Sequence, residues 1–210
     1  MEATKIKNIA NILNSNLPGE YAHTELMPVN RPYSSMVRNS ADSYRHSAVA
    51  IILYESNYEL ESILIQRPKY EGAHSNQIAF PGGKMDDTDS SLEHTARREC
   101  MEEIGIPFDA PKLLGALTDI YIPVSRYIVK PYVFHLEKLP DLIPDQREVE
   151  TIIPFRLKEL LSEDILKSTS MKMGNGLTQK NVPYYNIQNQ MVWGATGMML
   201  AEFRAILRLV

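Results

Sequence analysis

The stretch from Gly82 to Ile106, GGKMDDTDSSLEHTARRECMEEIGI, places a glycine turn, an acid-rich loop and a helix in direct succession. Ser90 with Glu93 three residues later fits a capping box, which predicts a helix that starts near Ser90. Gly105 fits a C-terminal stop, because glycine readily adopts the left-handed conformation that ends many helices. Apolar residues recur at every fourth position of this helix and form one stripe: Leu92, Ala96, Cys100 and Ile104.

Three glutamates, Glu99, Glu102 and Glu103, follow Arg98 on the predicted helix. At about 100° per residue, Glu99 and Glu103 lie roughly 40° apart at the edge of the apolar stripe, with Glu102 on the opposite side. Half-buried carboxylates repel each other, and a hard cation such as Mg²⁺ or Mn²⁺, which prefers oxygen ligands, removes that repulsion. Arg98 can brace a neighbouring carboxylate through a two-pronged hydrogen bond. An isolated acidic run is usually a solvated helix face, but the glycine turn before it and the Gly-Ile stop after it favour a metal site for phosphate chemistry.

These residues resemble the Nudix box, G-x5-E-x7-R-E-U-x-E-E-x-G-U, in which U is aliphatic. Gly83 corresponds to the opening glycine, and the segment from Arg98 to Ile106 follows the second half of the box closely. The first half departs, because Asp89 stands in place of the acid and eight residues instead of seven separate it from Arg98. This lengthening, with the pattern P-G-G-x-x-D-x-x-D formed by Asp86 and Asp89, resembles the coenzyme A pyrophosphatase branch of the Nudix hydrolase superfamily.

A second block, residues 63–83, resembles a segment of the same branch, L-L-x-x-R-S-x-x-x-R-x-H-x-G-Q-x-A-F-P-G-G. The matching residues are Arg67, His74, Gln77, Phe80 and Pro81. Three positions differ, with Pro68 for the usual Ser, Gly72 for a common Arg and Asn76 for a common Gly. They fall in the part that should contact coenzyme A. Near the C-terminus, residues 193–196 also resemble a W-G-x-T segment of the branch, so the likeness extends from about residue 45 to 200.

The resemblance implies an α/β fold, specifically a Nudix-type α/β/α sandwich with a mixed sheet. It also implies metal-dependent hydrolysis of the diphosphate of coenzyme A or an acyl-coenzyme A to phosphopantetheine and adenosine 3′,5′-bisphosphate. The helical spacing makes Glu99 and Glu103 the first choices for ligands of Mg²⁺ or Mn²⁺. Glu102 is the third, either as a ligand of a second ion or as a group that orients the attacking water. The resemblance adds the carbonyl of Gly83.

Further site residues are predicted outside the helix. The superfamily often supplies an acid from a distal loop, so Glu148 or Glu150 is a candidate general base, with a solvated loop-edge pair as the alternative. Arg67 is the best candidate for a cation that faces the substrate phosphates, and Lys69 is a weaker one. His74 can contact a phosphate or a base, or it can be an ordinary surface or capping histidine. Gln77 belongs to the predicted substrate-binding residues because it matches the upstream block. Trp193 can stack on adenine or belong to the core.

Two other functions are compatible with the chain. One is a Nudix hydrolase of another nucleoside diphosphate derivative, such as ADP-ribose or a dinucleotide polyphosphate, for which the 3′-phosphate of the substrate would not matter. The other is a non-catalytic nucleotide sensor. The intact series Arg98, Glu99, Glu102 and Glu103 argues against a sensor, because a pure binder has no need of three acids.

Length and composition limit the remaining choices. With 210 residues, we expect an N-terminal helix and irregular arm over residues 1–44 and a Nudix domain over residues 45–210. The net charge of −4 and the absence of a long Lys/Arg run argue against a nucleic-acid partner. Cys100 is the single cysteine, which excludes an internal disulfide, and its place on the stripe predicts a core residue. No apolar run has the length of a signal peptide core or a membrane span, so we expect a cytoplasmic protein without a membrane partner. Members of the superfamily often form homodimers, and the N-terminal arm is a candidate to mediate one.

Apolar patterning along the chain predicts the order of the elements. A helix over residues 3–15 precedes an irregular segment, and the expected strands are 47–54, 62–67, 113–122, 127–136 and 151–155. After a short helix at 157–161, we expect a hairpin of 182–187 with 191–193 and a C-terminal helix at 195–209. Strands on both sides of one helix, with a last helix for the other face, indicate an α/β/α arrangement.

Overall fold

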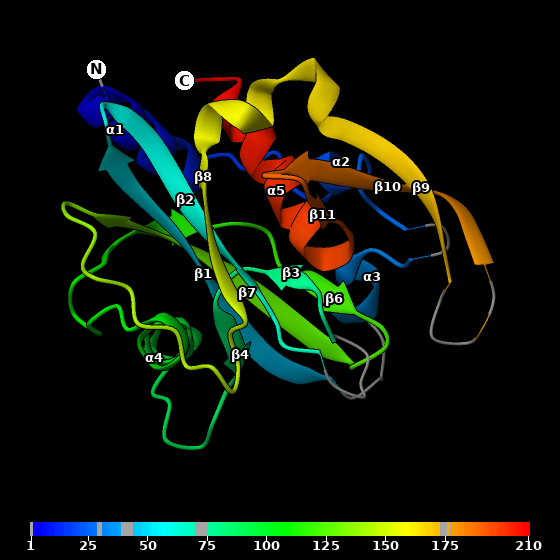
Figure 1. The fold of residues 1–210 in the computed structure, drawn as a ribbon, viewed down its shortest axis with the longest axis horizontal. Coiled ribbons are helices and arrows are strands. Elements are labelled where there is room, and N and C mark those ends of the chain that lie inside the picture. The colour runs from blue at the N-terminus through cyan, green and yellow to red at the C-terminus, as the bar shows by residue number, and fades with distance from the viewer. Residues whose placement is uncertain (1, 29–30, 39–43, 70–74, 173–175, 177) are drawn as a thin grey trace.

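The computed structural model describes residues 2–28, 31–38, 44–69, 75–172, 176 and 178–210 (Figure 1). The helices are α1 (Glu2–Leu13), α2 (Glu20–His23), α3 (Ser34–Arg38), α4 (Leu92–Ile104) and α5 (Gly194–Leu207), with 3₁₀ turns η1 (Leu157–Leu161) and η2 (Glu163–Ile165). The strands are β1 (Arg45–Ser56), β2 (Glu59–Gln66), β3 (Ile78–Ala79), β4 (Gly82–Lys84), β5 (Lys112–Ala116), β6 (Ile120–Ile122), β7 (Tyr127–Leu136), β8 (Thr151–Arg156), β9 (Leu166–Lys172), β10 (Thr178–Ile187) and β11 (Gln190–Val192). None of the helices in these ranges is long and apolar enough to cross a membrane.

The main sheet is mixed and has the order β3-β2-β1-β7-β5, with β4 on β1, β6 on β7 and β8 on β2. The pair β1–β7 is parallel, and the other pairs are antiparallel. Strand β1 changes its antiparallel partner along its length, because residues 54–56 pair with β2 whereas residues 47–49 pair with β4. The exchange of partners places Gly82 and Gly83 of β4 beside β1, on the part of the sheet that α4 covers.

Helices α4 and α5 cover opposite faces of this sheet (Figure 1). Ala96, Cys100 and Ile104 of α4 pack with Ala48, Ala50 and Ile52 of β1, whereas Ile51 and Leu53 of β1 join the core that α5 closes. Because β1 is buried on both faces, its central residues form a continuous apolar run instead of an alternating one. The predicted fold class, an α/β/α sandwich with a mixed sheet, is confirmed.

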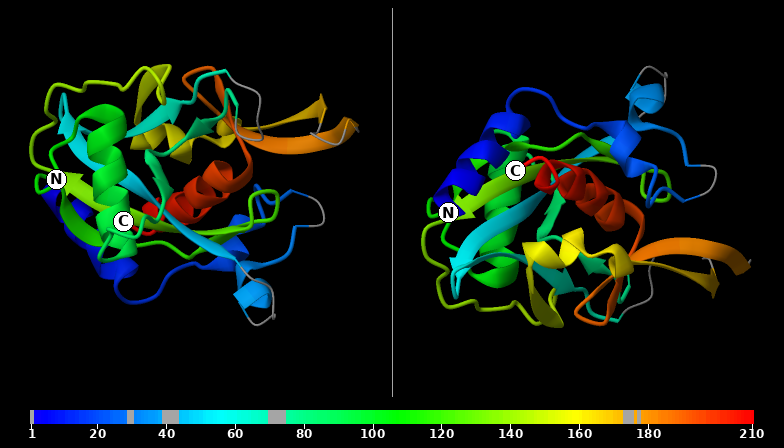
Figure 2. Two further views of the ribbon diagram at one scale, coloured as in Figure 1. Left: turned by 90° about the horizontal axis from the view of Figure 1, so that it is seen from below. Right: turned by 90° about the horizontal axis from the view of Figure 1, so that it is seen from above.

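A second sheet, in the order β11-β10-β9, extends from the side of the sandwich as a projecting ribbon (Figure 2). The predicted hairpin of its C-terminal part is present as β10 and β11. Strand β9 was not expected, because its sequence LKSTSMK is polar and mostly exposed. Apolar and polar residues alternate along a strand when one of its faces is buried. A strand exposed on both faces shows no such alternation.

Most expected elements are present with ends shifted by a few residues, and two of the differences have a clear local cause. The predicted strand 113–122 is broken into β5 and β6, because the N–H of Thr118 is bonded to the Glu202 carboxylate (3.0 Å) and not to a neighbouring strand. The helix cap is Ser91 instead of Ser90, since Ser91 Oγ accepts the N–H of His94 (3.1 Å). Gly105 ends α4 with φ of 77°, as expected for a left-handed cap.

The N-terminal arm contains two short helices that the sequence did not predict, and buried charges attach it to α5. His23 Nε2 lies 3.0 Å from a carboxylate oxygen of Glu202, and Arg204 Nη1 donates to Glu25 (2.7 Å). Leu26, which directly follows Glu25, is fully buried. The arm residues thus share one core with α5, and the division of the chain at residue 44 stays a prediction.

Candidate metal centre on helix α4

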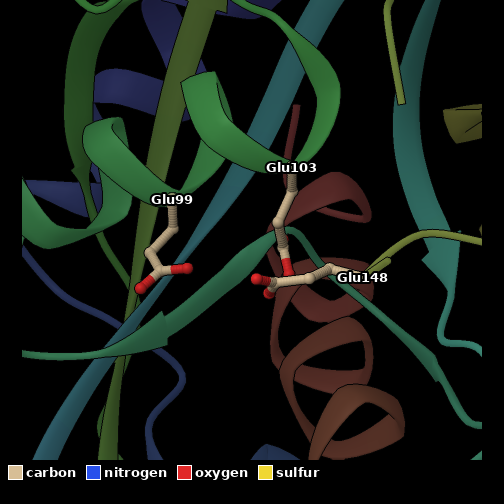
Figure 3. Close-up of side chains that lie close together, drawn as sticks. All are labelled: Glu99, Glu103 and Glu148. Atoms are coloured by element: carbon tan, nitrogen blue, oxygen red, sulfur yellow. The ribbon is translucent and has the colours of Figure 1, made fainter. Parts of the chain in front are cut away.

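Three carboxylates converge below helix α4 (Figure 3). Glu99, Glu103 and Glu148 each place an oxygen within 4.8 Å of the others. Glu99 and Glu103 lie one turn apart on α4 and are only 8% and 1% exposed, whereas Glu148 reaches in from the loop before β8 and is exposed. The burial of the two helix glutamates agrees with their place at the edge of the apolar stripe.

The loop that carries Glu148 is attached to the C-terminal end of α4. The N–H groups of Ile143 and Asp145 donate to the carbonyls of Ile104 and Glu103, both at 3.0 Å. These bonds satisfy carbonyls that a helix end otherwise leaves without partners. A turn from Asp145 then presents Glu148, whose N–H donates to the Asp145 carbonyl (2.9 Å). Glu150 takes another path, since its N–H bonds to Gln66 of β2 (2.8 Å), and it is outside the cluster.

The glycine pair of β4 makes room for the carboxylates. A Cβ on Gly83 would lie 2.4 Å from Glu99 Oε1, and a Cβ on Gly82 would lie 2.4 Å from the backbone oxygen of Ala48. The N–H of Gly82 donates to Glu103 Oε2 (2.8 Å). Each glycine therefore has its own steric role: Gly82 allows β4 to approach β1, and Gly83 allows Glu99 to approach β4.

Arg98 holds the acidic loop and the helix together. Its guanidinium makes a two-pronged contact with Asp89, with Nε and Nη2 each 2.9 Å from a carboxylate oxygen. Its Nη1 donates to Glu99 and to Glu102, both at 2.9 Å, and its Nη2 to the carbonyl of Lys84 (3.2 Å). Arg98 depresses the pKa of Asp89, and the Asp89 carboxylate raises the pKa of Arg98, so both stay charged. Asp89 thus serves to orient Arg98 and is not part of the carboxylate cluster.

Burial shifts the ionisation of the two helix glutamates. Desolvation raises the pKa of Glu99 against the opposing charge of Arg98, and desolvation raises the pKa of Glu103 to about 8. Two buried carboxylates and a third one beside them form a set of hard oxygen donors without a compensating number of close cations. Such a set fits a divalent cation of the Mg²⁺ type, which removes both the repulsion and the desolvation penalty.

The raised pKa of Glu103 predicts how the stability of the metal-free protein depends on pH. Unfolded Glu103 ionises near 4.5, whereas the folded side chain ionises near 8. The folded state therefore holds more protons between these values, and the free energy of unfolding falls as pH rises through this window, by roughly 4 kcal/mol from this group. Urea unfolding in EDTA between pH 5 and pH 9 measures the decline.

Glu103→Gln is the matched control, and it should flatten most of the decline because the glutamine cannot ionise. Added Mg²⁺ should restore stability to the wild type at pH 8 to 9 and do much less for the variant. Equal pH profiles for both proteins in EDTA would show that Glu103 does not titrate in this range.

The predicted substrate-binding residues divide into three groups. Arg67 Nη1 lies 3.4 Å from Glu103 Oε1, so this arginine reaches the cluster directly. The carbonyl of Gln77 accepts the N–H of Arg67 (3.0 Å), which closes the loop between β2 and β3. Lys69 is exposed, and no contact within the described ranges joins it to the three glutamates. His74 and the Gly72 position lie outside the described residues.

The position where the branch commonly has glycine is occupied by an asparagine with a compatible backbone. Asn76 has φ of 57°, in the left-handed region that glycine and asparagine tolerate best. Its side chain accepts a hydrogen bond from Gln66 Nε2 (2.8 Å), and its N–H donates to the carbonyl of Pro68 (3.2 Å). The substitution therefore preserves the turn that brings Arg67 and Gln77 together.

Three other predicted residues are placed by the structure away from the cluster. Glu102 is exposed and accepts the Arg98 hydrogen bond, so the three-carboxylate set contains Glu148 in its place. Trp193 is half-buried at the N-cap of α5. Cys100 is 1% exposed within the core below α4, as its place on the stripe predicts, and burial raises the pKa of its thiol.

The sequence did not point to Asp145 or Thr95, which position other site residues. Asp145 ties the Glu148 loop to the end of α4, and the buried Thr95 hydroxyl donates to Asp89 (2.9 Å). Thr95 lies six positions after Asp89, in the first turn of α4, and this short separation is the only sequence signal for its contact. No local signal marks Asp145, because its partner is a backbone carbonyl more than forty positions earlier.

Comparison with known proteins places this geometry in a family. A family model described as NUDIX domain matches residues 44–172. The uncharacterized Nudix hydrolase NudL of Photorhabdus laumondii is 31% identical over 77% of this chain and 84% of its own length. Nudix hydrolase 3 of Caenorhabditis elegans is 27% identical over 84% of this chain and 80% of its own. A solved C. elegans Ap4A hydrolase binary complex has a TM-score of 0.52 at 16% identity, over 79% of this chain and 99% of that one, which shows a shared fold.

The matched region contains β4, α4 and the Glu148 loop, so the family likeness and the carboxylate cluster coincide in the molecule. Enzymes of this family generally use divalent metal ions to hydrolyse the phosphoric anhydrides of nucleotide-derived small molecules. This chain belongs to the Nudix family and is a Nudix pyrophosphohydrolase.

Proposed function

We propose that this enzyme hydrolyses the diphosphate of coenzyme A or an acyl-coenzyme A and releases phosphopantetheine and adenosine 3′,5′-bisphosphate. The observation that carries the proposal is the contact between the two sequence blocks. Arg67 of the upstream block lies against Glu103 of the box, 3.4 Å apart. The residues that resemble the coenzyme A branch are therefore beside the cluster where a diphosphate would be cleaved.

Glu99 and Glu103 would hold the metal, with the carbonyl of Gly83 as a further candidate ligand and Glu148 beside them. When bound, Mg²⁺ or Mn²⁺ supplies positive charge that neutralises diphosphate oxygens and makes water more acidic. Arg98 keeps Glu99 oriented through its contacts with Asp89 and Glu99. The buried positions of Glu99 and Glu103 exclude water from their inner sides, so their charges act at short range in a low-dielectric environment.

The reaction forms a bond between the oxygen of water and one phosphorus and breaks the bond from that phosphorus to the bridging oxygen. Glu148, exposed at the open side of the cluster, is the candidate base that accepts the proton of the water. The bridging oxygen leaves with the other phosphate. Arg67 is the candidate donor to the diphosphate, and Gln77 positions it through the backbone bond between the two residues. Glu102 is close enough to Arg98 to help align it.

A substrate panel tests the proposal. Coenzyme A, dephospho-coenzyme A, ADP-ribose and a diadenosine polyphosphate are each incubated with Mg²⁺ or Mn²⁺, and the products are separated. We expect adenosine 3′,5′-bisphosphate from coenzyme A, with dephospho-coenzyme A about 10- to 100-fold poorer in kcat/KM. Loss of the 3′-phosphate removes a charge-assisted contact worth about 1.5–3 kcal/mol.

Turnover of ADP-ribose or the dinucleotide alone would contradict the coenzyme A assignment. The assignment as a hydrolase of phosphoric anhydrides would still hold. The fold shared with an Ap4A hydrolase makes the dinucleotide an informative competitor. Equal rates for coenzyme A and dephospho-coenzyme A would show that the enzyme does not recognise the 3′-phosphate.

A further inference from the structure

The two arginines at the carboxylate cluster are held very differently. Arg98 donates hydrogen bonds to Asp89, Glu99, Glu102 and the Lys84 carbonyl, and these bonds are 2.9–3.2 Å long. Among the residues that the structure describes, the side chain of Arg67 has one hydrogen-bond partner, Glu103, at 3.4 Å. A guanidinium with several short hydrogen bonds is fixed in place, whereas one long contact leaves the side chain able to change partner.

The Nε group of Arg67 supports the same contrast. This atom is buried and makes no hydrogen bond to any residue that the structure describes, although the side chain as a whole is 26% exposed. A buried N–H without an acceptor is unfavourable, so the observed position of Arg67 leaves one donor to be satisfied by another group. The unused donor and the long contact with Glu103 both indicate a side chain that lacks its full set of partners among the described residues.

We propose that Arg67 is a placeholder cation that occupies Glu103 in the metal-free enzyme and turns to the substrate diphosphate when metal binds. Without metal, Arg67 supplies the positive charge that faces Glu103, as Arg98 does for Glu99. With a divalent ion held at Glu103, the charge of Arg67 would no longer be needed there, and the guanidinium would be free for an anion. Metal loading and substrate binding are thereby coupled through one side chain. The inference rests on the proposed metal site and is independent of which diphosphate is the substrate.

Side-chain NMR tests the movement directly. The Nε–H signal of Arg67 is assigned by its loss in Arg67→Lys, and Mg²⁺ alone is titrated into the protein without substrate. We expect the Arg67 signal to shift with the same midpoint as Mg²⁺ binding. The Nε–H signal of Arg97 is the internal reference, because Arg97 is bonded to Glu93 and to the carbonyls of Phe108 and Pro111, away from the cluster.

A pair of variants tests the energetic coupling. Arg67→Gln removes the charge beside Glu103, and Lys69→Gln removes an equal charge two residues away on an exposed side chain. Mg²⁺ affinity is measured from thermal shifts of the wild type and both variants in the same buffer. We expect Arg67→Gln to bind Mg²⁺ roughly tenfold more tightly than the wild type, and Lys69→Gln to stay within about twofold.

Each result decides a different point. An Arg67 signal that ignores saturating Mg²⁺, or equal Mg²⁺ affinity in the two variants, would overturn the placeholder role and leave Arg67 as a substrate contact alone. Weaker Mg²⁺ binding in Arg67→Gln would also overturn it, since Arg67 would then support the metal site. No Mg²⁺ binding by the wild type would instead refute the metal site of the proposed function.

Discussion

Glu103→Gln is expected to reduce turnover at least about 10²- to 10³-fold while the protein remains folded. The substitution preserves volume and retains an oxygen that can accept the Gly82 N–H, so the packing around α4 changes little. It removes the charge of the most buried member of the cluster, which is 1% exposed. Losses of this size are typical when one preorganised charge or donor is removed from a catalytic site. Steady-state rates with saturating Mg²⁺, together with circular dichroism, measure the effect.

Glu150→Gln is the matched control. Glu150 is an exposed acid in the loop that carries Glu148, but it lies outside the carboxylate cluster. It should change turnover less than about twofold, and Glu148→Gln should fall between Glu150→Gln and Glu103→Gln if Glu148 acts as the base. Near-normal metal-dependent activity in Glu103→Gln would refute its assignment as a ligand. Equal losses in Glu103→Gln and Glu150→Gln would indicate a general effect of charge.

Gly83→Ala is expected to lower turnover on the order of 10²-fold and to weaken metal binding. The new methyl group would lie 2.4 Å from Glu99 Oε1, and real Cβ atoms do not approach another heavy atom so closely. Glu99 is fixed by Arg98 and by its burial, so the carboxylate must move away from the cluster to make room. A displacement of about 1 Å in a catalytic group is enough for a loss of this size. Mn²⁺ binding and kcat are the measurements.

A second substitution separates the contact with Glu99 from a general disturbance of β4. Glu99→Asp shortens the side chain by one methylene group, so the combined variant Gly83→Ala/Glu99→Asp has no clash between the two residues. We expect the double variant to lose less than the sum of the two single losses, expressed as free energies of activation. Gly83 is not among the residues with positive φ, so alanine adds no backbone strain there. Strictly additive losses would show that Gly83 does not act through Glu99.

Most of the fold was predicted from apolar spacing and capping residues that lie within a single helix or strand. Helix α4 follows from its apolar stripe and its Gly105 cap, and the buried strand β1 follows from its apolar run. Strand β9 and the short helices α2 and α3 were missed, because they are held by contacts with β10, α5 and β6, respectively, and not by a pattern of their own. The break between β5 and β6 was missed for the same reason, since Glu202 is more than eighty positions away in the sequence.

The sequence by itself determined that two carboxylates of helix α4 lie together. The spacing of Glu99 and Glu103 puts both on one buried edge, and that relation depends only on helical geometry. Only the tertiary structure decided that the third carboxylate is Glu148 and not Glu102 or Glu150. That choice depends on the two backbone bonds between the loop and the carbonyls of Glu103 and Ile104. Backbone groups are the same in every residue, so such long-range bonds leave no mark in the sequence, and the folded chain alone reveals them.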